Sequence, residues 1–275
     1  IKGGYDIVVY DVNKAALAEV VAAGAKEAAS SKEVAEQCDT IITMLPNSPH
    51  VKAAVLGENG VLEGAKPGSI IIDMSSIAPD ASKEVSAECA KKGVRMIDAP
   101  VSGGTVGAEN GTLALMVGGE EADLEEVRPL LDTMAGSIVH CGPIGAGNTT
   151  KLVNQMIIAV EMAGIAEAYG MGVKAGLKPQ VIYNAIRGGG AGSRIMDLKM
   201  EKVIARDFEP GFRLDLHIKD VRNGVETSQK LGAAIPLTEL AFGEMCMLSA
   251  KGMGTEDHCC MMKYYEMLDE IVFEK

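Results

Sequence analysis

The sequence predicts an α/β domain with a doubly wound parallel sheet, followed by an all-α domain. Up to about residue 140, short apolar runs rich in Val and Ile alternate with helical segments, which is typical of a parallel sheet covered on both faces. After Gly147 the strand-like runs stop and only helical periodicity remains. We therefore expect the two domains to span residues 1–145 and 146–275.

Six strand-like runs define the first domain: residues 7–10, 39–45, 68–73, 94–98, 113–117 and 137–140. Helices are predicted between them at residues 14–23, 49–56, 79–91 and 120–134. Ser30 and Glu33 form a capping box for one further helix. The second domain is predicted to hold helices near residues 148–174, 179–186, 193–204, 213–231, 236–250 and 255–273. Ligands of such sheets bind beyond the carboxyl ends of the strands, so a site is expected there.

Charge and cysteine usage exclude several classes of function. Lys and Arg number 26 against 38 Asp and Glu, and the net charge of −12 disfavours nucleic acid and anionic membranes as partners. The six cysteines are scattered and lack metal-ligand spacing, which predicts a reducing, cytoplasmic location and no metal site. Since Glu161 and Glu167 interrupt the most apolar helix, no membrane-spanning segment is expected.

Asp11 ends the first strand-like run and is a candidate cofactor-binding residue. In dinucleotide-binding folds, an acidic residue at this place accepts hydrogen bonds from the adenine-ribose hydroxyls and repels a 2′-phosphate. Neither Val12 nor Asn13 could hold such a phosphate, so NAD is favoured over NADP. The alternative is an ordinary N-cap, because Asp11 or Asn13 could cap the helix predicted from residue 14.

The glycine turn that cradles the pyrophosphate in such folds, Gly-x-Gly-x-x-Gly, does not occur in the sequence. It would precede the strand at residues 7–10 by about one helix, and Ile1 leaves no room for it. We therefore expect residues 7–10 to be the second strand of the fold. We also expect the natural chain to begin about 20–25 residues earlier, with a first strand and this turn.

A glycine-rich segment follows the run that ends at Asp98. Ser102 supplies a hydroxyl donor, and the two glycines after it leave backbone N–H groups able to bind a carboxylate or an oxyanion. Gly107 and Gly111 extend the segment, which predicts a flexible loop. The alternative is a plain tight turn without a ligand.

The long helix predicted from about residue 148 begins with polar residues and is otherwise almost wholly apolar. Asn148, Lys151 and Asn154 recur at i, i+3 and i+6, so they share one face of the helix. The helix dipole disfavours a cation near the N-terminus, so we expect it to lower the pKa of Lys151 and help this residue donate a proton. The alternative is a solvated helix start.

A second polar cluster occupies residues 215–223, where Lys219 and Asn223 are i, i+4 neighbours on a predicted helix. Spacing alone favours a routine surface helix here. The four histidines have neither metal-like nor triad-like spacing, so they are not candidates for catalysis by themselves.

Together these segments resemble the β-hydroxyacid dehydrogenase family, which includes 3-hydroxyisobutyrate dehydrogenases and, more distantly, 6-phosphogluconate dehydrogenase. The similarity runs from residue 1 to the C-terminus, and the motifs at Asp98–Gly104 and Gly145–Gln155 carry most of it. Within the family, the sequence is most similar to bacterial tartronate semialdehyde reductases. The segments that indicate this are residues 41–51, 73–79, 185–189 and 210–220. The implied fold of the first domain is Rossmann-like.

On the substrate side, the resemblance implies a role for each candidate residue. Lys151 matches the catalytic lysine of the family, and Asn154 matches the asparagine that helps orient the substrate. Ser102, Gly103 and Gly104 match the loop that holds the substrate carboxylate.

The resemblance also implies the cofactor side of the site. Leu45 and Pro46 match the residues under the nicotinamide half, and Ser76 lines the same crevice. Lys219 matches a lysine that reaches the site from the helical domain and is assigned to the cofactor side, with the acidic Asp220 beside it. Arg213 and His217 lie where substrate selectivity could arise.

The implied activity is the reversible reduction of tartronate semialdehyde to D-glycerate with NAD or NADP, by a homo-oligomer that is a dimer or a tetramer. One alternative keeps the fold but changes the substrate to 3-hydroxyisobutyrate, succinic semialdehyde or glyoxylate. A second alternative, from a different class, is a non-catalytic relative that uses the fold to oligomerise or to bind a partner.

Overall fold

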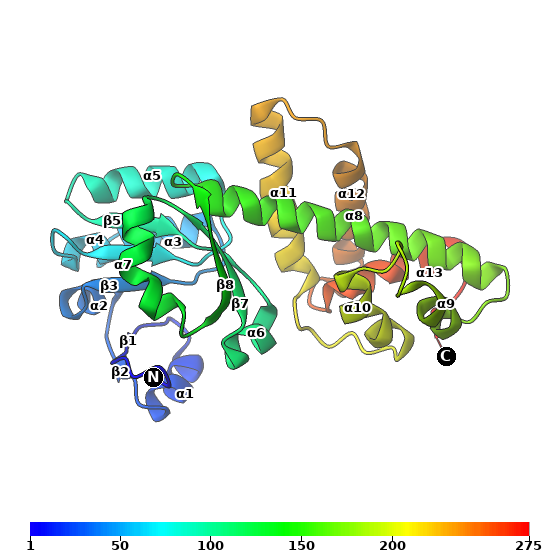
Figure 1. The fold of residues 1–275 in the computed structure, drawn as a ribbon, viewed down its shortest axis with the longest axis horizontal. Helices are drawn as coiled ribbons and strands as arrows, with labels where there is room; N and C mark the ends of the chain where they lie inside the picture. Colours follow the sequence, from blue (N-terminus) through cyan, green and yellow to red (C-terminus); the bar gives the residue numbers. More distant parts are fainter. Residues whose placement is uncertain (275) are drawn as a thin grey trace. The chain divides into compact units, whose positions relative to one another are not determined.

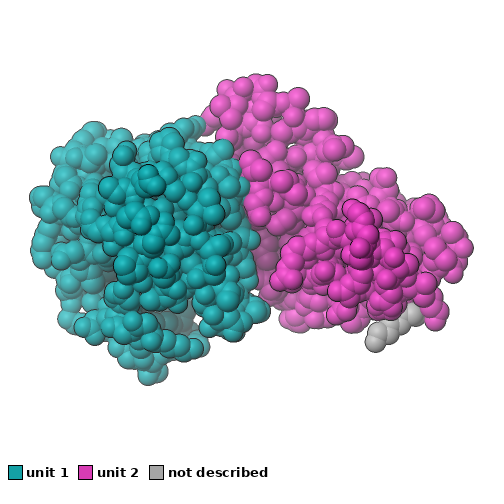
Figure 2. Space-filling model, in the orientation of Figure 1, with its two compact units in different colours: residues 1–151 teal, residues 152–275 magenta. Residues whose placement is uncertain are grey.

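The computed structural model describes residues 1–274 and divides into two compact units, Ile1–Lys151 (unit 1) and Leu152–Lys275 (unit 2), which Figure 2 shows in different colours.

Unit 1 alternates strands and helices (Figure 1). Its strands are β1 (Val8–Val9), β2 (Lys26–Glu27), β3 (Thr40–Thr43), β4 (Ile70–Asp73), β5 (Arg95–Asp98), β6 (Val101–Ser102), β7 (Leu113–Gly118) and β8 (Ala135–Gly142). Its helices are α1 (Lys14–Ala22), α2 (Ser31–Gln37), α3 (Ser48–Leu56), α4 (Val61–Gly64), α5 (Pro79–Ala90), α6 (Gly104–Asn110) and α7 (Glu121–Leu131). Helix α8 (Ala146–Lys174) begins in unit 1 and continues into unit 2.

Each of the six predicted strand-like runs contains a strand, and each predicted helix of the first domain forms. The capping box is present at the start of α2, where Ser30 Oγ accepts a hydrogen bond from Glu33 N at 3.1 Å. The Glu33 carboxylate in turn accepts one from Ala29 N at 2.7 Å. Local sequence signals therefore place these elements correctly.

The larger sheet is dominated by parallel pairs, as predicted, and two antiparallel pairs are added to it. Its strands lie in the order β3-β4-β5-β7-β6, with β8 also paired to β7. β3, β4 and β5 run parallel, but β7 is antiparallel to β5 and β6 and parallel to β8. Between β5 and β7 the chain forms only β6 and the short helix α6. This is less than a full crossover, so β7 returns antiparallel.

The buried strands β4 and β5 separate two hydrophobic cores. Ile71 and Met96 point into the core formed with α2, α3, α4 and α5, whereas Ile70, Ile72 and Ile97 point into the core formed with α7. The alternation follows from the two-residue period of a strand. Both faces of the sheet are therefore covered by helices, as the continuous apolar runs predicted.

β1 and β2 form a two-stranded parallel sheet of their own, with Val8 opposite Lys26 and Val9 opposite Glu27. Within residues 1–274, no strand joins this pair to the six-stranded sheet, whose edge strand β3 pairs only with β4. The strand that ends at Asp11 in the prediction is thus present but lies outside the main sheet.

Residues 101–111 form regular structure, which corrects the prediction of a flexible loop. β6 pairs antiparallel with β7, and α6 follows immediately. Gly103, with φ at 136°, precedes the helix, and Gly111, with φ at 64°, ends it. Both backbone angles favour glycine, so these residues act as helix boundaries.

Unit 2 is entirely helical among its described residues. It contains α9 (Pro179–Ile186), α10 (Arg194–Ile204), α11 (Leu214–Leu231), α12 (Pro236–Leu248), a π-helix (Ser249–Met253), a 3₁₀ helix (His258–Met261) and α13 (Met262–Asp269). The helix predicted over 255–273 is therefore shorter and begins as the 3₁₀ helix. Tyr169, Tyr183 and Phe273 are the largest fully buried side chains, and Tyr169 meets Phe273 edge to face with ring centroids 6.4 Å apart.

Helix α8 is long and apolar enough to cross a membrane by length and composition alone, with a mean hydropathy of 1.4 over an 18-residue window. Core helices of soluble proteins meet the same criterion, and 39% of that window is buried within the structure. Several of its exposed side chains are apolar, among them Val153, Ile157 and Met171.

Candidate active site

Two buried carboxylates lie side by side at the carboxyl ends of β4 and β5. Asp73 and Asp98 are directly paired in the parallel register, and neither side chain is exposed. Asp73 Oδ1 accepts hydrogen bonds from Thr43 Oγ1 at 2.8 Å and from Ser75 N at 3.1 Å. Asp73 therefore holds together the ends of β3 and β4.

Asp98 connects the end of β5 to the start of α8. Its Oδ1 accepts a hydrogen bond from Gly145 N at 2.7 Å, and its Oδ2 accepts one from Asn148 N at 2.6 Å. Burial raises the pKa of Asp98 to about 6, and the nearby Asp73 carboxylate also raises it, although the two backbone N–H donors act in the opposite direction.

Glycines allow the backbone to approach the Asp98 carboxylate closely. A Cβ atom on Gly118 would lie 2.4 Å from Asp98 Oδ1. A Cβ atom on Gly147 would lie 2.3 Å from Met116 O and 2.6 Å from Asp98 O. Because real Cβ atoms do not come so close to oxygen, neither position accepts a larger residue without a shift of the backbone.

Asn148 adds a second connection between α8 and the strand ends. Its side chain is fully buried, with Oδ1 accepting from Ile77 N at 3.0 Å and Nδ2 donating to Ser82 Oγ at 3.0 Å. The first turn of α8 is thereby joined to the segment that precedes α5 and to α5 itself. Lys151 follows one turn later and is only 7% exposed, so the polar helix start is buried rather than solvated.

The predicted residues after β3 and β4 also lie at these strand ends. Leu45 N donates a hydrogen bond to Ser75 Oγ at 2.8 Å, which joins the two segments. Leu45 and Ser76 are half-buried, and Pro46 is exposed. The structure thus brings this group to the same edge of unit 1 as the buried carboxylates.

Asp11 is exposed at the end of β1, and its Oδ1 accepts a hydrogen bond from Asn13 N at 2.7 Å. Asn13, not Asp11, caps α1, with Oδ1 accepting from Ala15 N at 3.1 Å and Ala16 N at 3.4 Å. The Asp11 carboxylate is therefore not needed as the cap of this helix.

Ser102 and the two glycines after it lie where β6 meets α6. Ser102 is half-buried and pairs with Ala114 in the antiparallel ladder, whereas Gly103 and Gly104 are exposed. Gly103 precedes the first turn of α6. The segment is an ordered turn in which Ser102 takes a fixed place.

In unit 2, a buried polar face of α11 meets α8, which corrects the prediction of a surface helix. Lys219 Nζ lies 2.9 Å from Asp220 Oδ1, and Asp220 Oδ2 accepts a hydrogen bond from Gln155 Nε2 at 2.6 Å. Asp220 is 2% exposed, and Asn223 is also buried. The charged residues face the inside of the helical unit because Gln155 of α8 offers them a partner.

His217 extends this buried face. Its Nε2 lies 3.0 Å from Gln155 O, and its Nδ1 lies 3.1 Å from Nδ1 of His258, which is also buried. Arg213, by contrast, is exposed and occupies the N-cap position of α11 without a capping hydrogen bond from its side chain. His217 is thus a packing residue of the helical core, joined to the same glutamine as Asp220.

Asn154 lies one turn after Lys151 on α8 and is half-buried. Its Nδ2 donates a hydrogen bond to Gln155 Oε1 at 2.9 Å. Gln155 therefore joins Asn154, Asp220 and, through its carbonyl oxygen, His217. Across the part of the chain that the structure describes, no group of three or more His, Cys, Asp or Glu residues could hold a metal ion.

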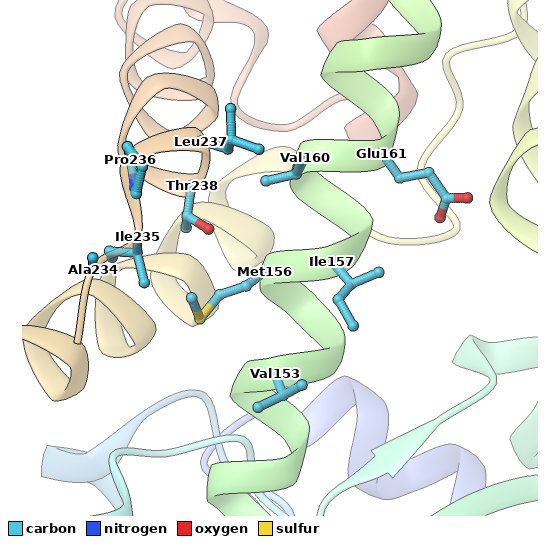
Figure 3. Close-up of a pocket in the computed structure, with 10 residues that line it drawn as sticks. All are labelled: Val153, Met156, Ile157, Val160, Glu161, Ala234, Ile235, Pro236, Leu237 and Thr238. Atoms are coloured by element: carbon cyan, nitrogen blue, oxygen red, sulfur yellow. The ribbon is translucent and has the colours of Figure 1, made fainter. Parts of the chain in front are cut away.

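An apolar pocket lies elsewhere in unit 2, between α8 and the segment that enters α12 (Figure 3). Val153, Met156 and Ile157 line one wall, and Ile235 and Leu237 line the other. Apart from Glu161 and Thr238, its lining residues are apolar, whereas the strand-end site of unit 1 is rich in polar groups.

The strand ends of unit 1 fit parts of a dinucleotide cofactor. The exposed Asp11 carboxylate can accept hydrogen bonds from ribose hydroxyls. Leu45 and Pro46 offer accessible apolar surface for a nicotinamide ring, and Ser76 offers a hydroxyl. These residues therefore fit the ribose and nicotinamide parts, whereas the sequence holds no Gly-x-Gly-x-x-Gly turn for the pyrophosphate.

Several residues of this region escaped the sequence analysis. Asp73, Gln155 and His258 were not singled out, and Asp98 was noted only as a strand end. The i, i+4 spacing of Lys151 and Gln155 was a usable signal for a buried polar face. The pairing of Asp73 with Asp98 had no such signal, because it depends on strand order.

Comparison with known proteins matches both parts of the chain to family models. Residues 1–142 match the NAD binding domain of 6-phosphogluconate dehydrogenase. Residues 145–265 match the NAD-binding region of NADP-dependent 3-hydroxyisobutyrate dehydrogenase. The two matches together extend over nearly the whole chain.

The similar proteins match this chain over most of their own length. The chain is 38% identical to 2-(hydroxymethyl)glutarate dehydrogenase of Eubacterium barkeri over 98% of this chain and 89% of that protein. It is 36% identical to 2-hydroxy-3-oxopropionate reductase of Escherichia coli, over 91% and 86%. The structure of 3-hydroxyisobutyrate dehydrogenase from Mycobacterium tuberculosis with L-serine superimposes with a TM-score of 0.89 at 32% identity, covering 95% and 91%.

Proposed function

The chain belongs to the β-hydroxyacid dehydrogenase family of nicotinamide-dependent oxidoreductases, and we propose that it interconverts a short β-hydroxy acid and its semialdehyde. The favoured pair is D-glycerate and tartronate semialdehyde. Similarity to the reductase of Escherichia coli supports this pair, as do the sequence segments at 41–51 and 210–220. The alternative pair is 3-hydroxyisobutyrate and its semialdehyde.

Lys151 is the proposed catalytic residue. In the reductive direction it donates a hydrogen bond to the carbonyl oxygen of the aldehyde and protonates the alkoxide as this forms. In the oxidative direction it takes the proton back. When bound, the nicotinamide supplies the hydride or accepts it. The expected lowering of the Lys151 pKa by the helix dipole stays a prediction.

The other site residues position the reactants in this proposal. The Ser102 hydroxyl and the backbone N–H groups of Gly103 and Gly104 bind the substrate carboxylate, and Asn154 orients the substrate one helical turn from Lys151. Asp11, Leu45, Pro46, Ser76 and Lys219 are assigned to the cofactor side.

The observation that carries the proposal is the environment of Lys151. It is 7% exposed on a helix whose first turn is joined to the strand ends by Asp98 and Asn148. A lysine ammonium is costly to bury, and a structural role would be met by an apolar residue in this otherwise apolar helix. A buried amine at a fixed position beside strand ends suits proton transfer.

A substrate panel tests the substrate assignment. Initial rates should be measured for reduction of tartronate, methylmalonate and succinate semialdehydes and of glyoxylate. The oxidation of L-serine and of 2-(hydroxymethyl)glutarate should be measured as well. We expect the highest kcat/KM for tartronate semialdehyde. A tenfold preference for another member would reassign the substrate but keep the reaction class.

The variant Lys151→Ala tests the reaction itself. We expect turnover to fall by a factor of about 10³ or more, with the Kd of the nicotinamide cofactor nearly unchanged. Lys174→Ala is the matched control, because Lys174 lies at the far end of the same helix and pairs with Asp269 at 2.8 Å. Residual activity of more than a few per cent in Lys151→Ala would remove the lysine from this role.

Cofactor titration tests whether the chain binds a nicotinamide nucleotide and which of the two it prefers. A non-catalytic oligomerising relative would bind neither NADH nor NADPH, whereas a reductase binds at least one of them. Asp11 favours NAD, so we expect the tighter Kd for NADH, and Asp11→Ala should reduce the preference. Calorimetry on the chain of residues 1–275 measures both values.

We also propose that the chain forms a dimer or tetramer through unit 2. Exposed apolar side chains on α8 and α12, including Ile157, Leu237 and Leu240, support an interface there. Sedimentation should give a mass of two or four chains. Ile157→Asp should lower that mass, and a monomeric unaltered protein would contradict the proposal.

A further inference from the structure

Asp98 has a position that the proposed reaction does not yet explain. It is the last residue of β5, fully buried, and each of its carboxylate oxygens accepts a backbone N–H from the start of α8. The two donors, Gly145 and Asn148, flank the first turn of the helix. One side chain therefore sets where α8 begins relative to the sheet edge.

Several elements of unit 1 pack around Asp98. Asp73 of β4 lies beside it in the strand register and carries the same charge. β7 presents Gly118, and the first turn of α8 presents Gly147. Lys83 of α5 lies over Gly145 but is exposed and pairs with Asp80. Lys151 follows one turn further along α8.

Such a carboxylate is unfavourable for folding by itself. Burial penalises its charged form, and Asp73 adds repulsion, so the charged state persists at neutral pH only because two N–H groups bind it. An uncharged amide would leave one of these two N–H groups without its acceptor, because it presents a single acceptor oxygen. The charged carboxylate therefore fixes the position of the two N–H groups that it binds, at the start of the helix that carries Lys151.

We propose that Asp98 is the positioning residue for Lys151, and that its ionised form holds the start of α8 in the catalytic arrangement. This inference rests on the proposed role of Lys151. When Asp98 takes a proton, one of its oxygens becomes a hydroxyl and the negative charge is lost, so both bonds to α8 weaken, and the bond to the hydroxyl oxygen weakens most. The helix start is then held mainly by the Asn148 side chain and by the remaining carbonyl oxygen of Asp98.

The test is the pH profile of reduction by the whole chain. In this direction Lys151 must be protonated, so its own titration can only lower the rate at alkaline pH. We expect kcat to fall as pH drops through about 6, where Asp98 takes up its proton. Substrate KM should change less than kcat, because the carboxylate-binding segment at Ser102 lies outside α8, which contributes only Lys151 and Asn154 to the substrate.

Asp98→Asn is the decisive variant, because its amide can accept only one of the two N–H groups at any pH. We expect kcat at pH 7.5 to fall about tenfold or more, cofactor Kd to stay within about twofold, and the acid limb near pH 6 to disappear. Asp123→Asn is the matched control: Asp123 is also buried in unit 1, but it pairs with Arg95 at 2.8 Å and does not touch α8. The control should keep the acid limb.

The outcomes separate this inference from the proposed function. If Lys151→Ala is inactive while Asp98→Asn keeps both the rate and the acid limb, the positioning role is wrong and the reaction stands. If Lys151→Ala stays active, the proposed reaction mechanism is wrong. An equal loss of kcat and of cofactor binding in Asp98→Asn would indicate a general structural defect and overturn the positioning role.

A measurement on the unaltered protein covers the case in which Asp98→Asn does not fold. Amide hydrogen exchange at Gly145 and Asn148 should be followed between pH 5 and 8 and corrected for the intrinsic pH dependence of exchange. We expect protection to drop at least several-fold below about pH 6 at these amides but not in the middle of α8. Protection that is independent of pH would overturn the inference.

Discussion

Each unit of the molecule buries one aspartate that binds several backbone N–H groups, but the two differ in the charge beside them. In unit 2, Asp257 accepts hydrogen bonds from Gly211 N at 3.0 Å and Cys259 N at 3.0 Å, and Lys199 Nζ lies 2.9 Å from its carboxylate. In unit 1, Asp98 binds two N–H groups and lies beside Asp73.

The balance between burial, hydrogen bonds and neighbouring charge decides the direction of each pKa shift. Burial raises the pKa of both groups. For Asp257, the hydrogen bond from Lys199 and that from Cys259 N outweigh burial, so its pKa lies below the ordinary value. For Asp98, burial prevails and the pKa rises to about 6. Folding therefore favours the ionised form of Asp257 and the protonated form of Asp98.

The comparison teaches that burial and hydrogen bonding alone do not assign a role to a charged residue. Asp257 joins the loop before α11 to the 3₁₀ helix and completes the core of unit 2. Asp98 ionises at a cost and binds only the helix that carries Lys151. The first is explained by folding, and the second by the proposed reaction.

The largest expected effect comes from removing the cation of unit 2. Lys199→Ala leaves Asp257 buried and without its counter-charge, so we expect the free energy of unfolding to fall by about 3–5 kcal/mol at pH 7. The loss should shrink as pH falls below the unfolded-state pKa of an Asp, about 3.9, because the stability that the lowered Asp257 pKa gives the unaltered protein is then lost. Chemical denaturation measures it. Lys202→Ala, which breaks a more exposed pair with Asp207, should cost less than about 1 kcal/mol.

For Asp98→Asn, we expect the pH dependence of the stability relative to the unaltered protein to have the opposite sign from that of Lys199→Ala. Because the folded pKa of Asp98 lies above that of the unfolded chain, its stabilising proton is lost as pH rises from about 4 to about 6. The stability of the variant relative to the unaltered protein should therefore increase by up to about 3 kcal/mol across this range and stay constant above it. A difference that does not vary with pH would contradict the raised pKa.

Two glycines of α8 provide the next test. A Cβ on Gly147 would meet backbone oxygens, so Gly147→Ala should cost about 1–3 kcal/mol and lower kcat. Gly164 has nothing within 4 Å of a Cβ position, so Gly164→Ala should stabilise by up to about 1 kcal/mol and leave kcat unchanged. Thermal unfolding and steady-state rates distinguish the two. Equal effects would mean that the start of α8 is not specially constrained.

The smallest expected effects concern two matched N-caps, one in each unit. Ser30 Oγ accepts from Glu33 N and Ser193 Oγ accepts from Met196 N, both at 3.1 Å. Replacing either serine by Ala should cost about 1 kcal/mol. Hydrogen exchange should show the loss of protection in unit 1 for Ser30→Ala and in unit 2 for Ser193→Ala. Loss of protection in both units from either variant would indicate that they unfold together.

Much of the fold followed from local patterns. Alternating apolar runs gave the strands of unit 1, and the polar stripe at Asn148, Lys151 and Asn154 marked the start of α8 as unusual. The direction of β7 was missed because strand direction depends on how far the chain travels between two strands. The buried face around Asp220 was missed because its partner, Gln155, lies on another helix.

The sequence by itself determined the alternation of strands and helices, the cap at Ser30, and the presence of a lysine in an apolar helix. These are properties of neighbouring residues, since periodicity and capping act over a few positions. Only the tertiary structure placed Asp98 beside Asp73 and beneath the first turn of α8, and gave Asp257 its lysine. The ionisation of a buried group is decided by its burial and by hydrogen bonds and charges from residues far away in sequence, which no local pattern contains.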